Sequence, residues 1–60
     1  MFTVYVYVPR YGIYDLIRRI QHFLSVDFVD GAFSVFVLSS DDEPDILEFD
    51  SSCRLVLRNE

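Results

Sequence analysis

The chain has 60 residues, of which 52% are hydrophobic and 17% aromatic, and its formal net charge is −5. This length supports one domain, residues 1–60, and the hydrophobic content excludes a disordered chain. A single Cys and a single His exclude an internal disulfide and a conventional structural zinc site, and no apolar run reaches the ~18 residues of a membrane span.

Residues 2–8 form the first expected element. Val4 and Val6 alternate with Tyr5 and Tyr7, and nearly every side chain in this run is β-branched or aromatic. We therefore predict a β-strand here. Pro9 is expected to end it, because proline cannot donate a hydrogen bond to a neighbouring strand.

The spacing of apolar residues changes over residues 13–24. Apolar side chains recur there at intervals of three and four, at Ile13, Leu16, Ile17, Ile20, Phe23 and Leu24. Polar side chains occupy the positions between them, among them His22 near the end of the segment. This period predicts an amphipathic helix of about three turns.

Two hairpins are expected in the second half of the chain. The pair Asp30-Gly31 lies between β-rich runs at 26–29 and 32–38, which is a strong signal for a tight type I′ turn. Residues 39–45 read as a loop. Residues 46–49 and 53–58 then predict two more strands, joined by a turn over 50–52.

The resulting element order is β-α-β-β-β-β. It predicts an α+β fold of two layers, in which an antiparallel sheet of about five strands packs on one α-helix.

One helix covers only one face of a sheet, so the other face becomes the candidate partner interface. Strand alternation places aromatic, apolar and arginine side chains on it. This expected interface consists of Tyr5, Tyr7, Phe36, Val56, Arg54 and Arg58. Aromatic and arginine residues are enriched in protein interfaces, and a chain this short has little else to cover such a face. We expect it to form a homodimer or to hold a protein partner.

The negative charge is concentrated in residues 41–50, while the other fifty residues sum to about +1 by direct count. The acidic segment contains Asp41, Asp42, Glu43, Asp45, Glu48 and Asp50. Three interpretations remain open: a hard-cation site, although the EF-hand spacing is absent; carboxylates that mimic nucleic-acid phosphates and dock on a basic enzyme; and a solvated loop that aids solubility.

Catalysis finds little support, so no catalytic residue, cofactor site or metal site is assigned. His22 is the only histidine, and Cys53 is expected to be a buried structural cysteine. An acidic chain without a clustered basic face is not expected to bind nucleic acid directly. A free thiol without an apolar leader segment predicts a cytoplasmic protein.

One local resemblance concerns the segment from Val35 to Asp41, which an acidic loop with Pro44 and a hairpin follow. Over about a third of the chain this pattern is similar to the strand-and-loop portion of phage uracil-DNA glycosylase inhibitors. Their glutamate-bearing N-terminal segment has no counterpart here, so no family is assigned.

Together these features predict a small protein-binding module that acts as a stoichiometric inhibitor or adaptor. Its partner would be another protein. By analogy with phage proteins that disable an enzyme of the host cell, this partner could be a basic enzyme that handles nucleic acid. The alternative is an obligate structural or regulatory subunit of a larger assembly.

Overall fold

The structure is a computed structural model that describes residues 1–60, and it is built from β-strands joined by short turns. There are six strands: β1 (Phe2–Arg10), β2 (Ile13–Ile20), β3 (Phe23–Val29), β4 (Ala32–Leu38), β5 (Pro44–Phe49) and β6 (Arg54–Asn59). None of the elements is a helix of the length and apolarity that crossing a membrane demands.

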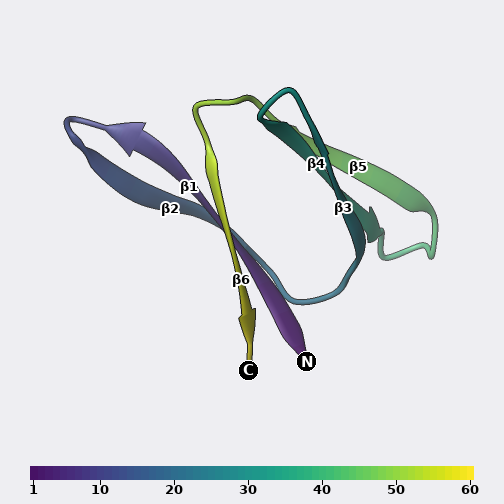
Figure 1. The fold of residues 1–60 in the computed structure, drawn as a ribbon. Coiled ribbons are helices and arrows are strands. Elements are labelled where there is room, and N and C mark those ends of the chain that lie inside the picture. Colours follow the sequence, from purple (N-terminus) through teal and green to yellow (C-terminus); the bar gives the residue numbers. More distant parts are fainter.

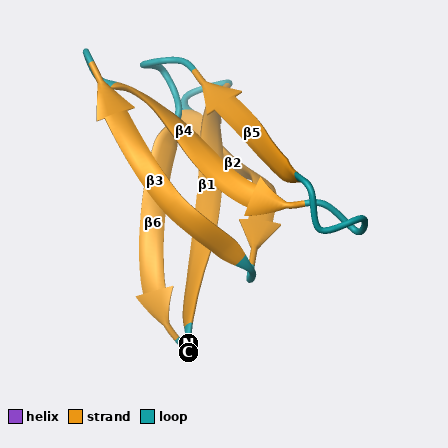
Figure 2. Cartoon of the chain, turned by 90° about the vertical axis from the view of Figure 1, so that its right-hand side faces the viewer, coloured by secondary structure: helices purple, strands orange, loops and turns teal.

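The strands form two antiparallel sheets of three strands each (Figure 1). Sheet A has the order β2-β1-β6, and sheet B has the order β3-β4-β5. The two sheets lie one over the other as layers, with β1 and β4 central in their sheets (Figure 2). The prediction of an α+β fold with about five strands is therefore wrong, because the chain is all-β and has no helix.

The predicted helix at 13–24 is instead β2, a tight turn and the start of β3. The register of β2 against β1 shifts between Val6 and Tyr7, so Ile17 is an extra residue in β2. A second shift makes Leu24 an extra residue in β3. Each bulge adds one residue to the strict alternation of a strand, and these additions produced spacings of three and four that resemble a helical period.

The predicted hairpin around Asp30-Gly31 is confirmed as β3 and β4. Asp30 has φ 52° and Gly31 has φ 82°, the two positive φ values that a type I′ turn requires. Phe28 and Phe33 pair across this hairpin with ring centroids 5.8 Å apart. The turn chemistry therefore fixes the register of the hairpin.

The predicted hairpin of 46–49 with 53–58 has the right strands but the wrong pairing. β5 pairs with β4 in sheet B, whereas β6 pairs with β1 in sheet A. The turn over residues 50–52 carries the chain from one sheet to the other. Strand propensity is local, but the choice of partner depends on which sheet leaves an edge free.

Pro9 does not end β1 as expected. It lies within β1 and pairs with Tyr14 of β2, while the pairing of β1 with β6 extends only to Tyr7 and Arg54. One side of β1 is thus unpaired at Pro9, so the missing N–H removes no ladder hydrogen bond.

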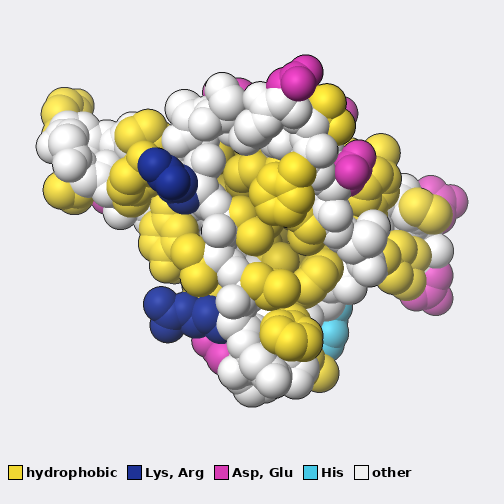
Figure 3. Space-filling view, viewed as in Figure 1, with side chains coloured by type: hydrophobic (Ala, Val, Ile, Leu, Met, Phe, Trp, Pro, Cys, Tyr) yellow, Lys and Arg dark blue, Asp and Glu magenta, His cyan; other side chains and the backbone are white.

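The core lies between the two central strands. Val4 and Val6 of β1 meet Phe33 and Val35 of β4, and these four are the buried hydrophobic residues of the chain. Side chains that pack around them are only partly buried: Ile20, Phe23, Val26, Val37, Leu47, Phe49, Cys53 and Leu55. A space-filling view shows hydrophobic side chains at the surface between the sheets (Figure 3). The core is thus small and open at its margin.

Candidate interaction surfaces

The outer face of sheet A gathers the tyrosines and most of the arginines. Because Val4 and Val6 point into the core, the alternate residues of β1 and their cross-strand neighbours point outward. We call this surface the Tyr–Arg face, and it consists of Tyr5, Tyr7, Tyr14, Leu16, Arg19, Arg54, Val56 and Arg58. No element of the chain covers it.

Two arginines of β6 lie against tyrosine rings on this face. The Arg54 guanidinium carbon is 5.4 Å from the centroid of the Tyr14 ring, and its Nε donates a hydrogen bond of 3.2 Å to the Tyr14 hydroxyl. Arg58 lies over Tyr5 at the same distance of 5.4 Å. Cation–π contact holds both guanidinium groups against the tyrosine rings of the face. Neither forms an ion pair, so both charges are available to a partner.

Glu60 neutralises the third arginine of the face. Its carboxylate accepts a hydrogen bond from the Tyr5 hydroxyl, and Arg19 lies 3.9 Å away. Hydrogen bonds from Tyr5 and Thr3, together with the charges of Arg19 and Arg58, hold the pKa of Glu60 below its usual value. The single carboxylate of Glu60 therefore balances one of the two arginines around Tyr5, and the face as a whole keeps a net positive charge.

Five of the six residues predicted for the aromatic interface lie together on the Tyr–Arg face. Phe36 does not: it belongs to β4 and points to the outer face of sheet B, beside Ile46. Sequence reasoning missed Tyr14, Leu16 and Arg19, because it assigned them to a helix. The alternation of Tyr14 and Leu16 was the available signal for a strand.

The acidic segment is divided into two groups. Asp41, Asp42 and Glu43 occupy the turn before β5, where the Ser39 hydroxyl accepts hydrogen bonds from the backbone N–H groups of Asp41 and Glu43. Glu48 and Asp50 lie at the other end of β5, about 20 Å away for a strand of this length. Asp45 lies on the opposite face of β5 from Glu48. The six acids therefore do not form one continuous patch.

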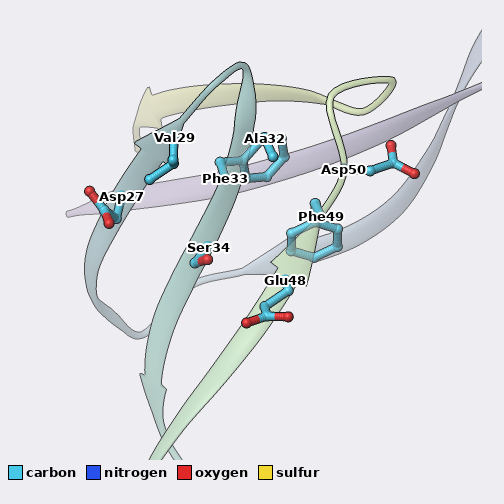
Figure 4. Close-up of a pocket in the computed structure, with 8 residues that line it drawn as sticks. All are labelled: Asp27, Val29, Ala32, Phe33, Ser34, Glu48, Phe49 and Asp50. Carbon is cyan, nitrogen blue, oxygen red and sulfur yellow. The ribbon is translucent and has the colours of Figure 1, made fainter.

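Glu48 and Asp50 instead line a hollow of about 450 Å³ on sheet B (Figure 4). Asp27, Ser34 and Glu48 lie in register on β3, β4 and β5, so one carboxylate stands on each side of the small central serine. Asp27 is one of the carboxylates that line this hollow, and it was not selected from the sequence. The hollow holds three carboxylates and no basic residue, so it is suited to a cationic group.

The turn after Glu48 positions the third carboxylate. Asp50 Oδ1 accepts a hydrogen bond of 2.9 Å from the Ser52 N–H and another from the Ser52 hydroxyl. These hydrogen bonds favour the charged carboxylate and hold the pKa of Asp50 below its usual value. Cys53 is half-buried at the margin of the core, with its Sγ 3.7 Å from Asp50 Oδ1.

The residues considered as catalytic or metal-binding candidates do not come together in the structure. His22 is exposed in the turn between β2 and β3, not on a helix. No three His, Cys, Asp or Glu side chains converge in an arrangement that could hold a metal ion. The cation-site interpretation of the acidic segment therefore gains no support.

The chain was compared with protein-family models, with curated proteins and with solved structures, and none of them matched it.

Proposed function

We propose that the chain is a protein-binding module that holds its partner on the Tyr–Arg face. The observation that carries this proposal is the placement of Val56 between Arg54 and Arg58 on β6, with Tyr5 and Tyr7 beside them on β1, on a sheet face that nothing in the chain covers. Tyrosine and arginine dominate the energetically important positions of protein interfaces. The module acts by occupying its partner, as a stoichiometric inhibitor or an adaptor.

The chemistry of the face describes the partner. Arg54 and Arg58 are already held against tyrosine rings, so they lose little conformational freedom when a partner docks. Each guanidinium can still receive a carboxylate in the two-hydrogen-bond geometry that arginine favours. The fitting partner surface therefore presents carboxylates around an apolar centre that can cover Tyr7.

The acidic hollow of sheet B supports a second contact of opposite chemistry. Asp27, Glu48 and Asp50 surround an indentation on the face remote from the Tyr–Arg face. An arginine or lysine of a basic partner fits these carboxylates. This is the surface on which docking to a nucleic-acid-handling enzyme would depend.

The experiment compares two matched variants of the purified chain. Tyr7 and Phe36 are both half-buried aromatics on the central strand of their sheets, so Tyr7→Glu and Phe36→Glu place the same charge on opposite faces. Immobilised wild-type chain and both variants are used to capture proteins from the native host. The proposal predicts a protein that Tyr7→Glu no longer retains and that Phe36→Glu still retains.

Other outcomes assign the function differently. A protein lost with Asp27→Asn/Glu48→Gln and retained by Tyr7→Glu would move the docking surface to the hollow. Tight binding of a fluorescent single-stranded oligonucleotide at physiological salt, abolished by Tyr7→Glu, would replace the protein partner by nucleic acid, because bases also stack on aromatic and arginine side chains.

One observation favours the obligate-subunit alternative. Only four hydrophobic residues are buried, whereas fourteen large hydrophobic side chains are exposed. Such a chain gains stability when a permanent partner covers part of this surface. Recovery of a folded chain expressed alone supports the module, and folding only on co-expression with a partner supports the subunit.

A further inference from the structure

Each sheet has two edges, and three of the four edge strands carry features that oppose pairing with another chain. In β2, Ile17 forms a bulge and Arg18 lies opposite the core residue Val6, on the inner face. β5 begins at Pro44 and places Asp45 on its inner face. β3 contains the bulge at Leu24. Bulges, prolines and inward-facing charges are the usual means by which edge strands avoid pairing.

β6 has none of these features. Its register against β1 runs without a shift from Phe2–Asn59 to Tyr7–Arg54, and it contains no proline. The residues on its inner face are Leu55, Leu57 and, at the end of the strand, Asn59, and the Leu57 side chain is 50% exposed. β6 is therefore a regular edge with two leucines on its inner face, and it can accept another strand.

The edge of β6 adjoins the open side of the core. Figure 2 shows β6 and β3 on the same side of the two layers, and Figure 3 views the molecule from that side, where hydrophobic side chains gather between the sheets. Phe28 of β3 is 61% exposed. A partner that pairs with β6 would therefore also cover apolar surface that the chain leaves in contact with water.

We infer that β6 pairs antiparallel with β6 of a second copy of this chain, so that two copies of sheet A form one six-stranded sheet. The two-fold axis that relates the copies stands perpendicular to the sheet. It therefore keeps the inner faces of the two copies on one side and pairs residues of the same face with each other.

Hydrogen bonding determines which residues can form the new ladder. The Glu60 N–H donates to the Met1 carbonyl at 2.7 Å, so its backbone points toward β1. The backbone N–H and C=O groups of successive residues in a strand point to opposite sides. Leu55, Leu57 and Asn59 therefore direct these groups away from β1, to the free edge of β6. A register centred on Leu57 pairs Leu57 with itself and Leu55 with Asn59 of the second copy, and uses every one of these groups.

A register centred on Val56 pairs Leu55 with Leu57 and also uses backbone groups at the free edge, so charge decides between the two registers. With Leu57 at the centre, Arg54 faces Glu60 of the second copy. With Val56 at the centre, Arg54 faces Arg58 of the second copy, and like charges directly opposite each other destabilise strand pairing. The charges therefore favour the Leu57-centred dimer, which also places both Tyr–Arg faces on one side.

The test is sedimentation of the purified chain over a range of concentrations. We expect a monomer–dimer equilibrium that Leu57→Lys weakens at least about tenfold, since the change puts two like charges at the two-fold axis. The matched control is Ile46→Lys on β5, whose side chain is 49% exposed, and it leaves the equilibrium unchanged. A wild-type monomer, or equal effects of both variants, would overturn the inference.

A charge reversal tests the register even if Leu57→Lys does not fold. Arg54→Glu weakens the dimer in the Leu57-centred register, because residue 54 then faces Glu60 of the second copy, and Arg54→Glu/Glu60→Arg restores it. In the Val56-centred register Arg54→Glu would face Arg58 and tighten the dimer. Tightening, or no rescue in the double variant whose fold circular dichroism shows to be intact, contradicts the proposed pairing.

Discussion

Arg54 and Tyr14 are forty residues apart in the sequence, yet the arginine lies 5.4 Å from the tyrosine ring centroid and donates to its hydroxyl. They belong to β6 and β2, which do not pair, so the contact reaches across β1. It ties the two edge strands of sheet A together on the outer face.

This contact predicts a measurable coupling. We expect Arg54→Ala to lower the free energy of unfolding by about 0.5–1 kcal/mol, the usual size of an exposed cation–π contact. Urea unfolding of Arg54→Ala, Tyr14→Leu and the double variant measures the coupling between the two side chains. Additive effects of the two substitutions would show that the contact contributes no stability.

The buried valines predict a larger loss. Val6→Ala removes two methyl groups from a fully buried side chain, and we expect the free energy of unfolding to fall by about 2 kcal/mol. Val56→Ala removes the same atoms from a side chain that is 37% exposed on the outer face, so it serves as the control with a smaller loss. Equal losses in denaturant unfolding would mean that the core lies elsewhere.

The β3–β4 turn predicts a conformational penalty. We expect Gly31→Ala to cost about 1 kcal/mol, because residue 31 has φ 82° and a side chain is strained there. A Cβ at this position would lie 3.6 Å from the Ser51 Cβ, an ordinary contact, so the cost comes from the backbone and not from a clash. Asp30→Gly should be tolerated in the same thermal unfolding assay, since glycine adopts positive φ freely.

Two carboxylates predict a loss of stability in acid. The pKa values of Asp50 and Glu60 are lower in the folded chain than their usual values. Their contribution is complete above the unfolded-state pKa near 4 and is lost as the pH falls through the lower folded-state pKa. We expect the unfolding free energy to fall in that range, and Asp50→Asn to make the fall shallower. An unchanged slope for Asp50→Asn, compared with Asp27→Asn as the control, would contradict this assignment.

Local patterns were sufficient for much of the fold. Alternation identified β1, and Asp30-Gly31 identified the β3–β4 hairpin, because these features depend on near neighbours in the sequence. The helix prediction failed because Ile17 and Leu24 are bulge residues, and a bulge depends on the partner strand. The same failure hid Tyr14 and Arg19 from the predicted interface.

The two candidate surfaces were predicted unequally well. Tyr5, Tyr7 and Val56 could be grouped because side chains alternate between two faces along each strand, and the paired strands β1 and β6 share these faces. Phe36 and the acidic residues could not be placed, because nothing in the sequence shows that the turn over 50–52 passes between sheets. That crossing, together with the one between β2 and β3, puts Phe36 and the Tyr–Arg face on different layers.

The pairing of β1 with β6 also has a consequence for the order of folding. Phe2 pairs with Asn59, so the central strand of sheet A obtains its second neighbour from the opposite end of the sequence. The β1–β2 and β3–β4 hairpins can form from adjacent residues, whereas the β1–β6 pairing has to close a loop of nearly the whole chain, which slows folding. During synthesis, sheet B can assemble first, and Val4 and Val6 remain without one flank until β6 has emerged from the ribosome.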